Sequence, residues 1–201
     1  MDTDPTPDTE TAASTRGFTG CAVALLVAAV LALVGATALA EIGKGLQGGG
    51  HLDNGATSGS VSDPLGAGAT ARYIDDLEVT VGRPRREAGG AYRFTVTYAN
   101  GTDEVLKPGG GSKRTATSTI ADAPVVVRPG RSSDGHPSDS TLTWLNEDEA
   151  AAALMPPLAE GGKRTVQVRV VPDRRGTPVT VEVRPPSASY RESAYWQFDL
   201  D

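Results

Sequence analysis

The chain has 201 residues, of which 38% are hydrophobic, 22% are charged and 5% are aromatic. Nine of the ten aromatic residues lie between Tyr73 and Phe198, so we expect one globular domain of about 130 residues in the C-terminal part. The formal net charge is −6. Residues 70–201 carry nearly balanced charges, which argues against a nucleic-acid binder. The single cysteine, Cys21, excludes an intramolecular disulfide.

An acidic tail and an apolar segment precede the expected domain. Residues 1–16 are rich in Thr and Pro without apolar periodicity, and are predicted to be disordered. Residues 17–40 contain no charged residue, and a helix over 21–40 would span about 30 Å, the thickness of the hydrocarbon core of a bilayer. We therefore predict a transmembrane segment in contact with lipid. A cleavable signal is the alternative, because Ala38-Leu39-Ala40 forms a small-x-small site.

Both interpretations of residues 17–40 imply that the C-terminal part of the chain is exported. Arg16 and Lys44 lie on opposite sides of the segment, so the positive-inside rule does not decide its orientation. We expect a single-pass cell-membrane protein whose C-terminal domain is extracytoplasmic, or a secreted domain if the segment is cleaved. Cys21 is either a small residue at the helix start or an acylation site. Alanine recurs at every fourth position, which would allow a helix-mediated homodimer or docking onto another membrane protein; the high alanine content of the segment explains the row equally well. These alanines are Ala24, Ala28, Ala32, Ala36 and Ala40.

The composition then changes twice. Residues 41–70 are rich in Gly and Ser and are expected to form a flexible linker. From residue 71 to 201 the pattern has period two, which is typical of strands with one buried and one solvated face. Five runs alternate clearly, at residues 77–81, 92–98, 166–170, 179–183 and 194–200. Weaker runs lie at residues 114–120, 124–128 and 141–145.

About seven or eight strands without intervening long helices predict an all-β fold, an antiparallel β-sandwich. Residues 146–155 are the one helical candidate. Asn146 is placed to cap this helix, with Glu149 as its capping-box partner. The acidic triplet Glu147-Asp148-Glu149 is therefore interpreted as capping chemistry, with a catalytic carboxylate pair as the alternative.

Residues 73–81 (YIDDLEVTV), 92–102 (YRFTVTYANGT) and 158–162 (LAEGG) resemble the telokin-like domain of exported actinobacterial proteins, a family of unknown function. The domain is also similar to a secreted mycobacterial immunoprotective antigen. The family usually has glycine where Asp76 stands. The resemblance implies an immunoglobulin-like β-sandwich over residues 70–201 and an envelope-exposed, non-enzymatic module. The family has no agreed active site, so the resemblance implies no catalytic residues.

We predict no catalytic, cofactor-binding or metal-binding residue. Asp134, His136 and Asp139 share one loop, which is either a weak cation site or an ordinary exposed turn; the other histidine, His51, lies in a different segment. Two arginine clusters could contact anionic envelope polymers or lipid headgroups, or simply keep loops and sheet edges solvated. These clusters are Arg83, Arg85 and Arg86 in one loop and Arg174 and Arg175 in another. Asn100-Gly101-Thr102 matches a glycosylation acceptor, and a turn explains the same residues.

The expected function is that of a membrane-anchored, extracytoplasmic, immunoglobulin-like module that binds a protein or a cell-envelope component and is not an enzyme. The alternative is an accessory subunit of a membrane complex that acts through its transmembrane helix. An extracellular hydrolase is a third class, and the lack of a visible nucleophile–base pair argues against it.

Overall fold

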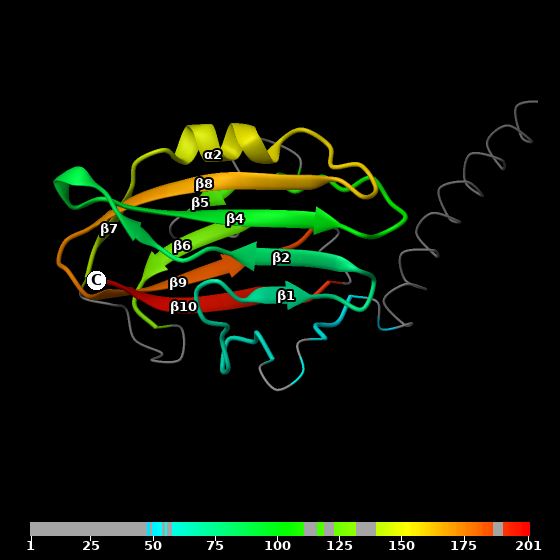
Figure 1. Cartoon of the computed structure of the whole chain (residues 1–201), viewed down its shortest axis with the longest axis horizontal. Coiled ribbons are helices and arrows are strands. Elements are labelled where there is room, and N and C mark those ends of the chain that lie inside the picture. Colours follow the sequence, from blue (N-terminus) through cyan, green and yellow to red (C-terminus); the bar gives the residue numbers. More distant parts are fainter. Residues whose placement is uncertain are drawn as a thin grey trace, which may run out of the picture. The chain divides into compact units, whose positions relative to one another are not determined.

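The strands of the domain form two sheets, and one α-helix lies beside them (Figure 1). The computed structural model describes residues 48, 50–53, 55, 58–110, 116–118, 123–131, 140–186 and 191–201. They belong to the compact unit Gly43–Asp201. Within them lie ten strands, one α-helix and one 3-10 turn, η1 (Ala88–Gly90). The prediction of an all-β fold is confirmed.

The larger sheet is antiparallel throughout. Its strands follow the order β1 (Thr70–Arg72), β2 (Leu77–Val81), β4 (Tyr92–Asn100), β8 (Lys163–Pro172) and β7 (Leu142–Trp144), with β3 (Arg85–Arg86) also paired to β4. The smaller sheet follows the order β10 (Ala194–Leu200), β9 (Thr177–Val183), β6 (Val125–Pro129) and β5 (Thr117–Ser118). Strands β5 and β6 are parallel, and the other pairs of this sheet are antiparallel.

All eight predicted runs contain a strand. The five clear alternations correspond to β2, β4, β8, β9 and β10, and the three weaker runs contain β5, β6 and β7. Two strands were not predicted, β1 with three residues and β3 with two. Both are too short for a period of two to be visible in the sequence.

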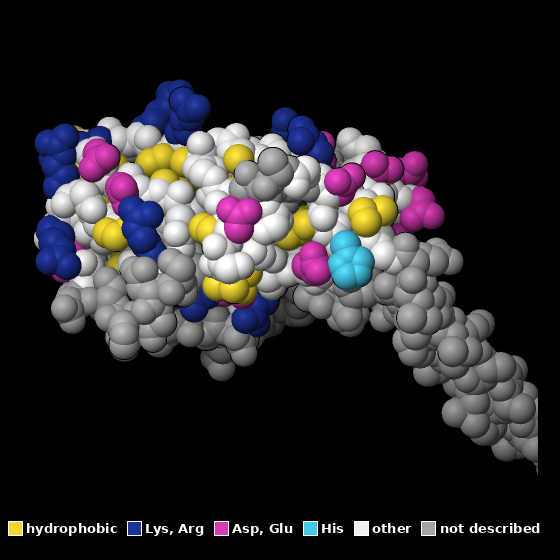
Figure 2. Space-filling view, turned by 90° about the horizontal axis from the view of Figure 1, so that it is seen from below, with side chains coloured by type: hydrophobic (Ala, Val, Ile, Leu, Met, Phe, Trp, Pro, Cys, Tyr) yellow, Lys and Arg dark blue, Asp and Glu magenta, His cyan; other side chains and the backbone are white. Residues whose placement is uncertain are grey.

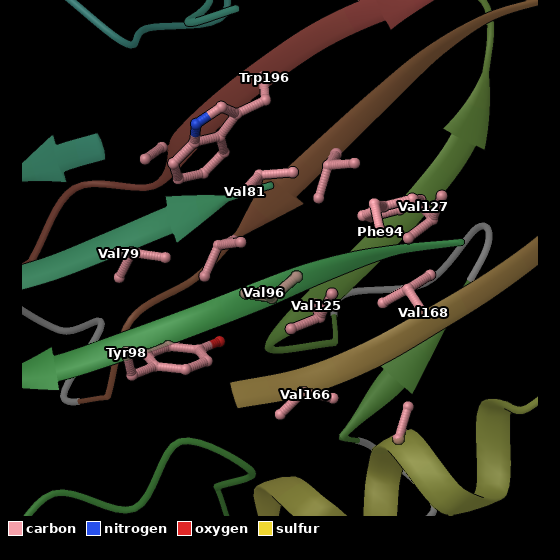
Figure 3. Packing of buried hydrophobic residues seen from close by; sticks show 14 of the residues in the cluster. Val79, Val81, Phe94, Val96, Tyr98, Val125, Val127, Val166, Val168 and Trp196 are labelled. Atoms are coloured by element: carbon pink, nitrogen blue, oxygen red, sulfur yellow. The ribbon is translucent and has the colours of Figure 1, made fainter. Parts of the chain in front are cut away.

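The core lies between the facing surfaces of the two sheets, where alternate side chains of each strand meet (Figure 3). Valines dominate it, and Trp196 of β10 is completely buried. Phe94 of β4 and Phe198 of β10 form an edge-to-face pair with ring centroids 5.4 Å apart. Valine and aromatic side chains suit this packing because they fill a pleated surface with little conformational freedom to lose.

Residues 58–70, which the sequence assigns to a flexible linker, pack against the domain. We call residues 58–66 the strap. Its Leu65 is 4% exposed, and its backbone donates from Leu65 N to Tyr195 O (2.8 Å) and accepts from Gln197 N (2.8 Å). Gly59 O accepts a further bond from Tyr195 N. The domain boundary at residue 71 is therefore corrected, because the strap lines β10 and contributes a core side chain.

Helix α2 (Glu147–Leu154) confirms the predicted helix and directs its buried side chains toward β8 and β5. The predicted cap is wrong, because the Asn146 side chain makes no capping bond. Its Oδ1 instead accepts from Arg169 N (2.8 Å), and its Nδ2 donates to Gln167 O (3.0 Å). The Asn146 side-chain amide thus bonds to the backbone of β8, and it does not cap the helix.

The turn between β1 and β2 is built on Asp76, the one non-glycine residue with positive φ in the described part of the chain (φ 66°). Its carbonyl accepts a hydrogen bond from Gly101 N (3.1 Å). A Cβ at position 101 would lie 2.5 Å from that oxygen, so Gly101 must be glycine for the turn to close.

Candidate functional site: a basic groove

A groove with a volume of about 540 Å³ opens beside the start of β4, on the outer face of the larger sheet. Its polar lining comes from outward-facing positions of β4 and β8, from β3 and from the segment between β2 and β3. The lining residues are Gly68, Gly82, Arg83, Arg85, Arg93, Phe94, Thr95 and Gln167.

Two glycines allow the groove to form. Gly82 directly follows β2, and its N–H donates to Thr95 O (2.8 Å); a Cβ there would lie 2.6 Å from Thr95 Oγ1. Gly68 has φ +90°, and its N–H donates to Val81 O (2.7 Å). A Cβ on Gly68 would lie 3.2 Å from Arg83 Nε, so the Arg83 side chain passes close over this glycine. Side chains at either position would crowd the groove.

Three arginines stand in a row across neighbouring strands beside the groove. Arg85 of β3 pairs with Arg93 of β4, and Arg93 pairs with Arg169 of β8. Cross-strand partners point to the same face, and like charges in such pairs are destabilising. Glu87 lies between two of them, with Oε1 3.3 Å from Arg93 Nε and Oε2 2.9 Å from Arg169 Nε. One carboxylate does not balance the row, so the groove keeps an excess of positive charge.

Arg83 and Arg85 supply most of this excess. Both side chains are exposed, and neither makes a hydrogen bond or an ion pair with another described residue. Guanidinium groups present several N–H donors in a planar fork and no acceptor. The pair is therefore available for a carboxylate or phosphate.

Charge is unevenly distributed over one face of the domain. On the face shown in Figure 2, Lys and Arg side chains gather mainly toward the end at which β4 begins, and Asp and Glu side chains are more frequent toward the other end. We call these the basic end and the acidic end. The groove opens at the basic end.

Only some arginines of the two clusters noted in the sequence line the groove. Arg83 and Arg85 line the groove, whereas Arg86 is exposed on β3 outside the lining. Arg174 donates through Nε and Nη2 to Ser140 Oγ (3.1 and 2.6 Å), and neither it nor Arg175 lines the groove.

Sequence reasoning missed the contribution of the strands to the site. Arg93, Thr95 and Gln167 were expected only to face solvent, as the polar partners in alternating runs. The usable signal was that two adjacent strands each place Arg on the outward face. Their register, which aligns them, could not be read from the sequence.

The acidic end holds two buried polar networks. The Arg191 side chain is 1% exposed and places Nη2 2.7 Å from Asp75 Oδ2, while its Nη1 donates to Pro186 O. Asn100 is 1% exposed; its Nδ2 donates to the carbonyls of Glu104, Leu158 and Ala159.

The match to a glycosylation acceptor is therefore explained by structure. Asn100 Oδ1 accepts from both Thr102 N and Thr102 Oγ1. With the amide also bonded to three carbonyls, Asn100 is a structural residue in the folded domain.

His51 lies beside a carboxylate and not in a metal site. Its Nδ1 is 2.8 Å from Glu192 Oε1, and Leu52 N donates to Glu192 Oε2 (3.1 Å). Partial burial opposes ionisation of Glu192, but these two hydrogen bonds outweigh it and hold the carboxyl pKa below its usual value. Among the described residues no group of three His, Cys, Asp or Glu side chains could hold a metal ion. The loop with Asp134, His136 and Asp139 lies outside those residues.

The acidic triplet Glu147, Asp148 and Glu149 occupies the exposed first turn of α2. Negative charge there is favourable because the helix N-terminus carries a partial positive charge. Glu149 forms no capping box, since Asn146 bonds to β8. The triplet is thus explained by helix electrostatics alone.

The apolar segment 17–40, with Cys21 and the alanine row, lies outside the described residues. In the part of the chain that the structure does describe, no helix has the length and apolar character to span a bilayer.

No family model matches the chain, and no curated protein matches it.

Proposed function

We propose that this protein is a membrane-anchored, extracytoplasmic, immunoglobulin-like module that binds a protein or envelope component without transforming it, and that its binding site is the basic groove. The observation that carries the proposal is the row Arg85, Arg93 and Arg169, which Glu87 alone counters among the described residues. A fold tolerates such repulsion at a small cost, and a bound anion would relieve it.

The chemistry of the groove supports binding over catalysis. Arginine guanidiniums stay protonated throughout the physiological pH range and cannot exchange protons as general acids or bases. The other polar side chains of the lining, Thr95 and Gln167, are neutral hydrogen-bonding groups. This set can orient and hold an anion.

The membrane anchor is proposed from the sequence of residues 17–40. The described domain shows where the chain joins the sandwich and where the groove lies. The chain enters the sandwich at the acidic end, where Leu52 forms a bridge to Tyr73. The groove lies at the basic end.

Two measurements test the proposal. Full-length protein should fractionate with membranes, and protease added to intact cells should degrade the domain. Isolated cell envelopes should retain detergent-solubilised protein, and Arg83→Ala/Arg85→Ala should release it. Recovery of the chain in the soluble cytosol, or envelope binding unaffected by the double substitution, would disprove the proposal.

A third variant separates the accessory-subunit alternative. Replacing residues 17–40 with an unrelated apolar helix should leave envelope binding intact if the domain is the functional part. Loss of binding in this variant, with membrane insertion preserved, would instead identify the helix as the active element.

A further inference from the structure

We propose that the ligand of the basic groove is a phosphodiester- or phosphate-bearing polymer, bound across strands β3, β4 and β8. This inference rests on the proposed function, since it names the chemistry that the same groove would recognise.

The lining side chains favour a ligand that accepts many hydrogen bonds and has few hydrogen-bond donors of its own. Arg83, Arg85 and Arg93 are donors only, and Thr95 and Gln167 each add a donor. A phosphate polymer presents only acceptor oxygens along its backbone, and the planar guanidinium fork matches two of these oxygens at once. Every side chain named here can donate to such a chain.

An acidic peptide fits the same groove less well. Its backbone N–H groups need acceptors, and burying them unpaired is unfavourable. Strands β4 and β8 pair with each other at Thr95 and Gln167, so their backbone groups are already hydrogen-bonded there and cannot accept from a peptide backbone. Among the lining side chains only the Thr95 hydroxyl and the Gln167 amide oxygen can accept. Charge alone would attract a peptide, but hydrogen bonding favours phosphate.

The groove lies far along the larger sheet from the point at which residues 50–53 join the domain. The bridge between Leu52 and Tyr73 marks the acidic end, and the register Leu77–Asn100 places the end of β4 there. Arg93 lies seven residues away along β4, or about 23 Å at the rise of a strand. Residues 50–53 therefore join the domain at the end away from the groove.

The test is equilibrium binding of the full chain, kept in detergent micelles, to three probes. They are inorganic polyphosphate, poly-L-glutamate of matched charge number, and vesicles containing phosphatidylglycerol. We expect polyphosphate to bind most tightly, with affinity that falls steeply as salt rises, because binding releases counterions. Preference for poly-L-glutamate or for the vesicles would overturn the inference.

A matched pair of variants locates the site. Arg83→Ala/Arg85→Ala should weaken polyphosphate binding by about tenfold and lower the salt slope by roughly 1.5, since two fewer phosphates are neutralised. Arg86→Ala/Arg175→Ala removes the same charge from the basic end but leaves the lining intact, and should change affinity by less than about twofold. Equal losses in both variants would show non-specific attraction and refute the site.

A single isosteric change provides a second readout. Gln167→Glu adds a carboxylate to the groove floor and should weaken polyphosphate binding at low salt without altering the circular dichroism spectrum. Unchanged affinity would contradict binding at this position. If envelope binding depends on Arg83 and Arg85 while polyphosphate does not bind, the proposed function survives and the phosphate assignment fails.

Discussion

The two ends of the sandwich treat their charged side chains in opposite ways. At the acidic end Arg191 is enclosed and held by Asp75 and a backbone carbonyl. At the basic end Arg83 and Arg85 are exposed, and no other described residue pairs with them. Enclosed charges must be satisfied for the fold to be stable, whereas exposed ones can be left for a ligand. The contrast separates residues that maintain the fold from those to which the proposed function assigns binding.

The largest expected effect is loss of the enclosed charge. Arg191→Met should lower the free energy of unfolding by about 3–5 kcal/mol, because Asp75 would keep a partly buried charge without its partner. Urea denaturation measures the change. Arg72→Met is the matched control, since the Arg72–Glu78 pair is exposed and contributes at most about 1 kcal/mol. Similar losses in both variants would contradict the assignment of Arg191 to the buried network.

Truncating Asn100 should come next, at about 2–4 kcal/mol. Asn100→Ala leaves the carbonyls of Glu104, Leu158 and Ala159 without this donor in a buried site. Asn100→Asp keeps the oxygen that accepts from Thr102 but places a second carboxylate oxygen against three buried carbonyls, so in chemical denaturation at neutral pH it should be at least as destabilising as alanine. An alanine variant as stable as wild type would show that these bonds contribute little.

A smaller effect of opposite sign is expected at Tyr98. Its hydroxyl is buried and has no partner among the described residues, so Tyr98→Phe should stabilise the domain by about 1 kcal/mol. Tyr73→Phe is the control, because the Tyr73 hydroxyl donates to Glu192 O (2.9 Å), and its loss should destabilise by a similar amount. Thermal unfolding at neutral pH would show whether the two signs differ.

The same tyrosines predict a weakness at alkaline pH. Burial raises the pKa of both phenols above the ordinary value of 10.0. The unfolded chain therefore releases these protons at lower pH than the folded one, and stability present below pH 10 is lost as pH rises further. Tyr98→Phe should flatten this loss in denaturation curves recorded between pH 9 and 12.

The smallest effect is expected in the groove. Arg85→Ala removes one member of a like-charge pair with Arg93 and should raise stability by about 0.2–1 kcal/mol at low salt, with the gain shrinking as salt increases. Arg86→Ala, which lies outside the groove, should change stability by less than about 0.5 kcal/mol. A clear destabilisation by Arg85→Ala would mean that the arginine row supports the fold.

The sequence predicted the strands well because burial on one face imposes a period of two, as in the alternation of Tyr92 to Tyr98. The sequence-based prediction was wrong where the structure of a segment depends on hydrogen bonds to a distant part of the chain. Residues 58–66 have a linker composition but find hydrogen-bonding groups on β10. Asn146 has a capping sequence but bonds to β8 instead.

The candidate site shows the same division. Arg83 and Arg85 could be noticed as a local cluster, whereas Arg93 and Arg169 join them only through strand register. Register depends on which side chains reach the core together, and that is a property of the whole sheet. The groove itself further requires Gly82 to lie against Thr95, a contact between two strands that local pattern does not reveal.

The strap has a consequence for how copies of the domain meet. An open outer strand is a template on which a second chain can add, and this is a common route to aggregation. The bonds of Tyr195 and Gln197 to Gly59 and Leu65 occupy donors and acceptors that β10 would otherwise offer. A segment rich in Ser and Gly and containing Pro is itself a poor strand former. The strap, which has the composition of a linker, thus shields the β10 edge of the smaller sheet from intermolecular pairing.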